Sequence, residues 1–236
     1  MIHIPKIFMG NLIEGSLERV LTNQSESETI EPQNTVLTTA ENVSRYIYVP
    51  TENVYIAKER TLLGKNWYDS HRELHKQHVV MPTIPQFIAF INYLKNNTGG
   101  TNDASSQEVA EILDDILTVR DPWRAQWLDA KFTKQNNQLQ INYNHQTISG
   151  QLKPQIIQPL TACIMEDCWA DVINPNSQGL PTTKKEKNSG GIYFWYPRED
   201  RVAGFGVFSE RAVLYCNWRP QYADGSLGVR ASFQRS

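Results

Sequence analysis

The sequence predicts an α+β fold, in which helices and strands occupy separate stretches of the chain. Two short apolar strands come first, stretches with helical spacing follow, and loops with short strands fill the remaining half. Regular alternation of strand and helix, which would indicate a parallel sheet, does not occur. At 236 residues the chain is long enough to bury one core, alone or with a small appendage.

Residues 1–45 are predicted to be an N-terminal extension or linker, and residues 46–236 to form the folded domain. Residues 22–44 are rich in Thr, Asn, Ser and Glu, a composition that buries little apolar surface. The opening segment, MIHIPKIFMGNLIEG, lacks the apolar stretch of a signal peptide. The sequence contains no run of about 18 apolar residues, so it predicts no membrane span. The sequence does not assign a localisation, and display at a cell or virion surface is one of the alternatives.

The predicted domain begins with a strand pair, Tyr46–Val49 and Val54–Ala57, joined by a turn. Three helices are expected next. Pro85 stands where the first turn of a helix tolerates proline, and Ser105 begins a capping sequence that ends at Glu108. The expected helices lie at about 66–77, 85–96 and 105–117.

The second half of the chain is predicted to contain a hairpin, a long loop and several short strands. Ala130–Phe132 and Leu139–Tyr143 are the two hairpin strands, the second alternating apolar with polar residues. Residues 174–191 are rich in Pro, Gly, Asn and Lys. A loop of that length in a compact domain is usually functional or mobile.

Composition and motifs favour a binding protein over an enzyme. The formal net charge of −2 lacks the basic footprint of a nucleic-acid binder. No phosphate-binding loop, dinucleotide fingerprint or nucleophile elbow is present. We therefore expect no catalytic residue, no cofactor, no nucleic acid and no membrane span.

Two clusters of metal-ligating residue types have simpler explanations. His71, His75 and His78 fall on one face of the predicted helix and could bind zinc or nickel, but a solvated helix face is the preferred interpretation. Cys163 and Cys168 bracket two acids at a spacing that suits neither a redox pair nor a zinc knuckle. Together with Cys216, the chain has three cysteines, which are too few for a disulfide framework. We expect these thiols to be reduced and mostly buried.

The segment from Tyr193 to Arg230 is the most informative part of the chain. It combines many aromatic residues with a regular alternation of residue types. Tyr and Trp bury a large area at a small entropic cost, which enriches them at recognition surfaces. Alternation predicts that Val202, Phe205, Ala212, Leu214 and Cys216 face inward, and that Gly204, Phe208, Val213, Tyr215, Asn217, Arg219, Gln221, Tyr222 and Asp224 face outward or lie on loops. A half-buried sheet with an aromatic core fits the same residues equally well.

Two regions resemble a known family. Trp67-Tyr68-Asp69-Ser70-His71 through Met81-Pro82-Thr83-Ile84-Pro85-Gln86-Phe87 resembles the start of a C-type lectin domain. The frame VAGF, SERAVLYCNWRP and SLGVR resembles the variable region of archaeal or archaeal-virus proteins diversified by a diversity-generating retroelement. The segments 117–124 and 178–181 are similar to that group as well. The resemblance spans roughly residues 46–236.

This resemblance implies a C-type lectin fold of the formylglycine-generating-enzyme type: a short sheet joining the ends of the domain, two packed helices and a more irregular second sheet. It also implies a ligand-binding variable region at about 193–230, in which error-prone reverse transcription changes selected codons while the frame stays fixed. The partner would be an unknown protein or cell-surface ligand. The positions that match the diversified ones are Gly204, Gly206, Phe208, Glu210, Val213, Tyr215, Asn217, Trp218, Arg219, Gln221, Tyr222, Asp224 and Ser226.

Other functions of the same fold remain as alternatives. Calcium-dependent sugar binding is disfavoured because Asn174-Pro175-Asn176 and Cys216-Asn217-Trp218 do not supply the expected acidic ligands. Formylglycine-generating activity needs a cysteine pair near the C-terminus, where only Cys216 is present. A fixed-specificity carbohydrate-binding lectin and a virion or tail attachment component are the remaining alternatives.

Overall fold

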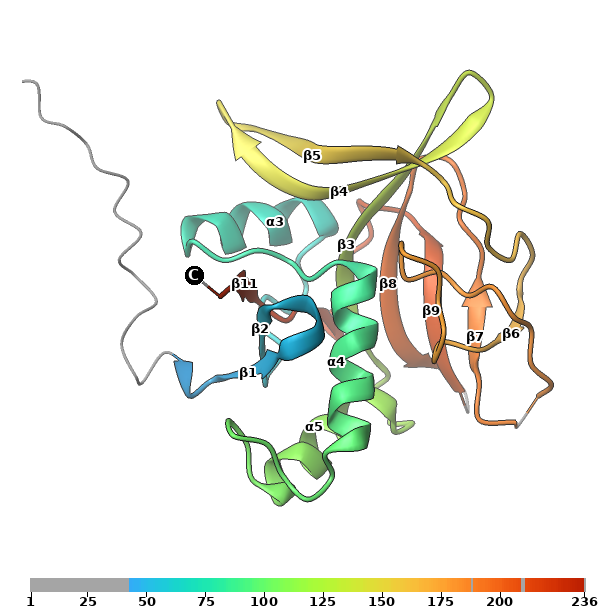
Figure 1. The fold of residues 1–236 in the computed structure, drawn as a ribbon. Helices are drawn as coiled ribbons and strands as arrows, with labels where there is room; N and C mark the ends of the chain where they lie inside the picture. The colour runs from blue at the N-terminus through green and yellow to red at the C-terminus, as the bar shows by residue number, and fades with distance from the viewer. Residues whose placement is uncertain (1–42, 188, 209–210, 236) are drawn as a thin grey trace, which may run out of the picture. The chain divides into compact units, whose positions relative to one another are not determined.

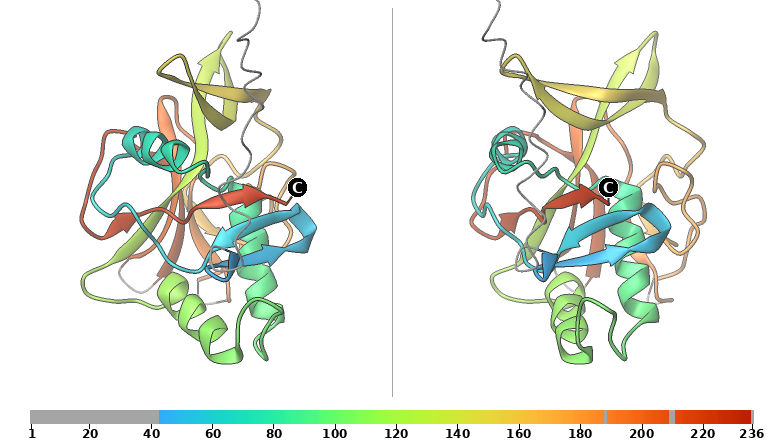
Figure 2. Two further views of the ribbon diagram at one scale, coloured as in Figure 1. Left: turned by 90° about the vertical axis from the view of Figure 1, so that its left-hand side faces the viewer. Right: turned by 60° about the vertical axis from the view of Figure 1, so that its left-hand side comes forward.

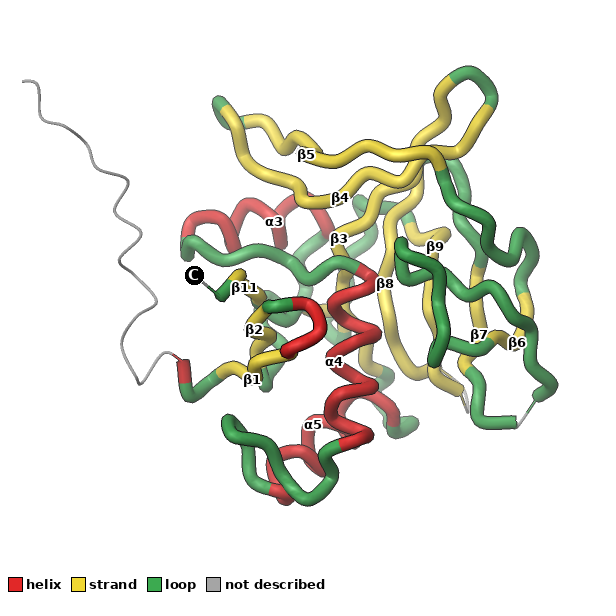
Figure 3. The backbone as a smooth tube through the Cα atoms, in the orientation of Figure 1, coloured by secondary structure: helices red, strands yellow, loops and turns green. Residues whose placement is uncertain are grey.

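A computed structural model describes residues 43–187, 189–208 and 211–235 of the chain. Nearly all of the predicted N-terminal extension, together with the opening segment assessed for a signal peptide, therefore lies outside the described residues. The described part combines helices α3, α4 and α5 with mostly antiparallel sheets (Figures 1 and 3), which confirms the α+β class.

A small sheet joins the two ends of the described chain. β1 (Tyr46–Val49) and β2 (Val54–Ala57) form the predicted antiparallel pair, joined by the 3-10 turn η1 (Pro50–Glu52). β11 (Ser232–Gln234), from the C-terminal end, pairs with the other edge of β2, as Figure 2 shows. The ring of Phe233 on β11 stacks on that of Tyr55 on β2, with 4.9 Å between the centroids.

The three predicted helices are confirmed, and each has an N-terminal cap. α3 (Trp67–Lys76) is capped by Asn66, whose side chain accepts a hydrogen bond from the Asp69 backbone. α4 (Ile84–Asn96) and α5 (Ser106–Leu117) begin with capping boxes formed by Thr83 with Gln86 and by Ser105 with Glu108. Each box satisfies backbone donors that a helix start leaves unpaired.

The large sheet has the strand order β5-β4-β3-β8-β9-β7-β6, with β10 pairing alongside β3. The pairs β7–β9 and β10–β3 are parallel and the others antiparallel. The bounds are β3 Arg124–Gln135, β4 Gln138–Ile148, β5 Gln151–Pro159, β6 Cys168–Ala170, β7 Ile192–Trp195, β8 Arg201–Phe208, β9 Arg211–Trp218 and β10 Leu227–Gly228.

The predicted hairpin is much longer than the sequence indicates. β3 and β4 have 12 and 11 residues, and β5 adds a third strand that was not predicted. β5 alternates exposed polar residues with half-buried Leu152, Pro154 and Ile156, but a proline within such a run argues against a strand. β4 and β5 form the ribbon that passes over α3 in Figure 1.

The main core lies between α4 and one face of the large sheet. Phe87 on α4 contacts Phe205 on β8, with ring centroids 5.3 Å apart, and Leu214 and Cys216 on β9 join the same cluster. Of the predicted inward residues, Phe205, Leu214 and Cys216 are buried in this core and Ala212 is half-buried against it. Val202 is buried outside this cluster and pairs with Trp218. The opposite face of β8 and β9 carries the candidate functional site.

The predicted loop at 174–191 is confirmed, and its first half is held firmly. The buried amide of Gln178 accepts a hydrogen bond from the Thr161 backbone and donates one to the Pro159 carbonyl, both 2.9 Å long. Gly179 adopts φ +77° against the start of α4, where an added Cβ would lie 2.7 Å from the Ile84 side chain and from the Pro85 backbone nitrogen. Only glycine fits this contact.

Candidate functional site

The site lies on the face of β8 and β9 that points away from α4. Its floor contains two glycines, because Gly204 pairs with Tyr215 and Gly206 with Val213. A Cβ at Gly204 would lie 2.6 Å from the indole ring of Trp218. The missing side chain therefore lets this ring lie close against the strand.

A β-bulge brings Trp218 to this face. Trp218 pairs with Val202 and Tyr215 with Gly204, so β9 contains one more residue than β8 over this stretch. Strict alternation from the inward Cys216 would turn Trp218 inward as well, but an extra residue reverses the order of the faces. As a result, the rings of Tyr215 and Trp218 stack with 4.3 Å between centroids and 21° between planes.

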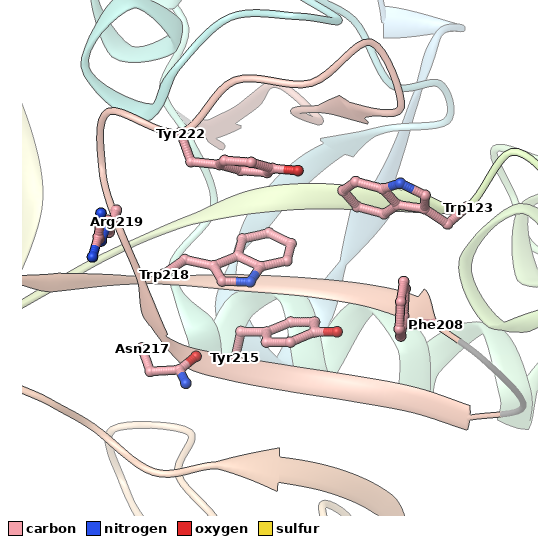
Figure 4. A pocket seen from close by; sticks show the side chains of 7 residues that line it. All are labelled: Trp123, Phe208, Tyr215, Asn217, Trp218, Arg219 and Tyr222. Carbon is pink, nitrogen blue, oxygen red and sulfur yellow. The ribbon is translucent and has the colours of Figure 1, made fainter.

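These rings form one side of a pocket of about 380 Å³. Trp123, which lies just before β3, closes another side, with its ring centroid 6.4 Å from that of Trp218 and 6.5 Å from that of Phe208. Tyr222, on the loop after β9, stands 6.3 Å from Trp218. Figure 4 shows the residues that line the pocket: Trp123, Phe208, Tyr215, Asn217, Trp218, Arg219 and Tyr222.

The pocket carries a few polar groups among its rings. Burial raises the pKa of Tyr215, with a smaller opposing effect of Arg211, and burial followed by the charge of Asp224 raises the pKa of Tyr222. Both phenols are therefore protonated at neutral pH and can donate or accept. The buried Oδ1 of Asn217 has no hydrogen-bond partner among the described residues. Arg219 is exposed and supplies the positive charge.

The structure brings together six of the positions predicted to contact a ligand. They are Phe208, Tyr215, Asn217, Trp218, Arg219 and Tyr222. Trp123 was missed: its segment was predicted only as a turn, and nothing in the local sequence shows that the turn lies beside β8 and β9. A tryptophan in a polar turn is the one signal that could have suggested a role at a surface.

The remaining predicted positions do not line the pocket. Gly204, Gly206 and Val213 belong to the pocket face but are buried, so they are not exposed to a ligand as predicted. The Trp218 ring covers Gly204, and Ala125 on β3 lies against Gly206. Gln221 is exposed on the adjacent loop. Asp224 and Ser226 shape a turn, where the Asp224 side chain accepts a 2.8 Å hydrogen bond from the Ser226 backbone. Glu210 lies outside the described residues.

The expectation of a solvated histidine face on α3 is wrong. His71 is fully buried, His75 is half-buried with its Nδ1 2.7 Å from the Thr147 hydroxyl, and His78 follows the helix end with φ 56°. The three do not share one face. His71 instead lies beside Asp129 and His145, which come from β3 and β4, a proximity that no spacing in the sequence indicates.

The three cysteines are free, as expected, but only Cys216 is buried, while Cys163 and Cys168 are half-buried. Burial raises the pKa of Cys163 to about 11, so its thiol is protonated at neutral pH. Asp167, which lies between Cys163 and Cys168 in the sequence, accepts a hydrogen bond from the Tyr196 backbone and pairs with Arg198 at 2.9 Å. These contacts agree with the structural role predicted for this segment.

Comparisons of the chain with protein-family models, with curated proteins and with solved structures gave no match. Within the described residues, none of the helices combines the length and apolarity that crossing a bilayer requires.

Proposed function

We propose that this protein binds a protein or cell-surface target through the aromatic pocket on β8 and β9, and that the residues around the pocket are diversified by a retroelement. The scaffold in this proposal is a C-type lectin fold. The observation that carries this proposal is that six of the positions that the resemblance implies to be variable line one pocket.

The arrangement of frame and pocket supports this proposal. The inward side chains of β8 and β9 belong to the main core, whereas the pocket residues contribute mainly to an open surface. A rigid scaffold that presents exchangeable side chains can change its ligand without losing its fold. The short sheet that joins the chain ends and the helices beside it are the features that the resemblance implies for a C-type lectin fold.

The lining chemistry favours a target with apolar side chains and a polar or acidic group. Five aromatic rings offer apolar faces, and aromatic residues with arginine dominate the energetics of many protein interfaces. Arg219 and Asn217 are placed to orient such a target through charge and hydrogen bonds. The stacked rings of Tyr215 and Trp218 also form a flat platform for the apolar face of a sugar, which makes a fixed-specificity lectin the second candidate.

A randomised library tests the binding proposal. The six pocket positions are varied together, the proteins are displayed on cells, and binders are selected against a purified lysozyme. A matched control library varies six exposed positions on β4 and β5, away from the pocket. We expect specific binders from the pocket library and few from the control. Equal yields, or protease sensitivity of most pocket variants, would contradict the proposal.

Two further measurements separate the alternatives. A glycan array, run with calcium and with a chelator, would reveal a fixed-specificity lectin by a reproducible sugar preference of the unvaried protein. Diversification itself is tested in the genome, where we expect a near-identical repeat, differing at adenines, beside a reverse transcriptase gene. If that repeat is absent, the proposal that the residues are diversified is wrong, while the proposal that the pocket binds a target is unaffected.

A further inference from the structure

Three buried side chains from three different elements meet beneath α3. His71 belongs to α3, Asp129 to β3 and His145 to β4, and their exposed fractions are 0%, 2% and 3%. The Nε2 of His71 lies 3.5 Å and the Nδ1 of His145 2.5 Å from Oδ1 of Asp129. One potential ligand atom of each residue lies within 4.8 Å of the other two.

His71 has no hydrogen-bond partner to explain its burial. Neither ring nitrogen forms a hydrogen bond to any described residue. A buried polar atom without a partner costs roughly 1–3 kcal/mol, and native structures contain few of them.

We propose that His71, Asp129 and His145 bind a divalent transition metal, with Zn²⁺ as the best match. Two neutral imidazoles and one carboxylate are a donor set that zinc accepts. Bonds of about 2.0–2.1 Å to a tetrahedral ion place two ligand atoms about 3.3 Å apart, close to the 3.5 Å between His71 and Asp129.

Binding requires one hydrogen bond to be exchanged for the metal. The 2.5 Å contact between Asp129 and His145 is too short for two ligands of one ion, so the ion takes the place of the proton between them, and the neutral His145 ring carries its one proton on Nε2 instead of Nδ1. The other oxygen of Asp129 keeps the 3.0 Å hydrogen bond from the His145 backbone. That bond would hold the carboxylate in position, as outer-shell partners of metal ligands do.

The surroundings indicate a structural ion. The Trp67 ring packs edge-on against both imidazoles, with centroids 4.3 Å from His71 and 4.9 Å from His145. The ion would tie α3 to β3 and to the base of the β4–β5 ribbon. The ring of His75, four residues after His71, lies 5.7 Å from the His71 ring between centroids, and its buried Nε2 has no hydrogen-bond partner among the described residues either.

Calorimetry on the full chain tests this site directly. The protein is stripped with a chelator and titrated with Zn²⁺, and thermal unfolding is followed with and without the ion. We expect about one equivalent bound and a higher melting temperature. His71→Ala should weaken zinc binding roughly tenfold or more, whereas the matched control His78→Ala, at an exposed histidine outside the cluster, should leave it unchanged. Equal loss in both variants would overturn the proposal.

A second measurement avoids any variant that fails to fold. Co²⁺ in a four-coordinate site with nitrogen and oxygen ligands gives intense visible absorption bands, which Zn²⁺ should remove by competition in the wild-type protein. If wild-type protein shows no such bands, or if zinc does not displace them, the cluster is a hydrogen-bonded network and the proposal is wrong. Neither measurement depends on the ligand of the aromatic pocket.

Discussion

At the scale of single residues, one carboxylate holds the C-terminal frame to the rest of the domain. Asp115 on α5 contacts Arg230 at 2.6 Å, Arg124 at 2.5 Å and Arg60 at 3.2 Å. Arg230 is fully buried, and it also donates to the backbone carbonyl of Lys58. Burial alone would raise the pKa of Asp115, but the three arginines outweigh it and the net pKa is lowered. The closing Arg230 is therefore a structural residue.

Removal of this carboxylate should be costly. We expect Asp115→Ala to lower the free energy of unfolding by about 3–5 kcal/mol, since it leaves the buried charge of Arg230 unpaired. Its neighbour Asp114, which pairs with Arg120 at the surface, is the matched control, and its alanine variant should change stability by less than about 1 kcal/mol. Urea unfolding compares the two. Similar losses would show that Asp115 is not the centre of this network.

Gly204 and Trp218 should be energetically coupled. A methyl group at position 204 meets the Trp218 ring, so Gly204→Ala should destabilise the protein. In a Trp218→Ala background the same change should cost less, with a coupling energy between about 0.5 and 3 kcal/mol. A double-mutant cycle of unfolding free energies measures it. Purely additive effects would mean that the ring does not depend on the glycine, and that backbone contacts alone restrict position 204.

At the scale of elements, β9 serves both the core and the pocket. Its regular part gives one face to α4 and the other to the pocket, and its bulge then adds Trp218 to the pocket face. The ribbon of β4 and β5 differs, because none of the residues in its outer strand β5 is fully buried. The large sheet therefore has a buried centre and a solvated edge.

This difference predicts unequal sensitivity along the sheet. Ile157 on β5 is 58% exposed, and Ile157→Lys should change the free energy of unfolding by about 0.5 kcal/mol or less. Phe132 on β3 is fully buried, and Phe132→Ala should cost about 3–5 kcal/mol. Chemical unfolding of both variants checks the contrast. A large loss for Ile157→Lys would indicate that the ribbon packs against another surface in solution.

At the scale of the whole molecule, residues from the C-terminal end complete two sheets. β11 pairs with β2, and β10 pairs with β3 beside the segment that leads to Trp123. Ser232 on β11 is buried, and its hydroxyl and backbone contact Val80. The folded domain thus depends on contacts between its two ends.

Truncation tests this dependence. A chain that ends at Ala231 loses β11 and the stacking of Phe233 on Tyr55, and we expect its free energy of unfolding to fall by at least about 2 kcal/mol, since several buried hydrogen bonds are lost. A chain that ends at Gln234 keeps the strand and should lose less than about 1 kcal/mol. Thermal unfolding distinguishes the two. Equal stability of both chains would contradict a stabilising role for β11.

The elements that could be predicted from the sequence are the local ones. Capping residues, helical spacing and short alternating strands depend on neighbours along the chain, and they predicted α3, α4, α5, β1 and β2. The same kind of pattern indicated which side chains of β8 and β9 enter the core. Six of the pocket positions were predicted from the family resemblance of the C-terminal frame. That resemblance, too, is a property of the order of residues along the chain.

Contacts between residues that are distant in the chain could not be predicted from the sequence. The bulge in β9 turns Trp218 outward, Trp123 comes from a separate turn, and Val213 is buried although alternation places it on the outer face. Asp129 and His145 reached His71 only through the pairing of β3 and β4 beneath α3. The physical reason is the same in each case: strand register and packing between elements depend on contacts across long separations, and no local pattern in the sequence specifies them.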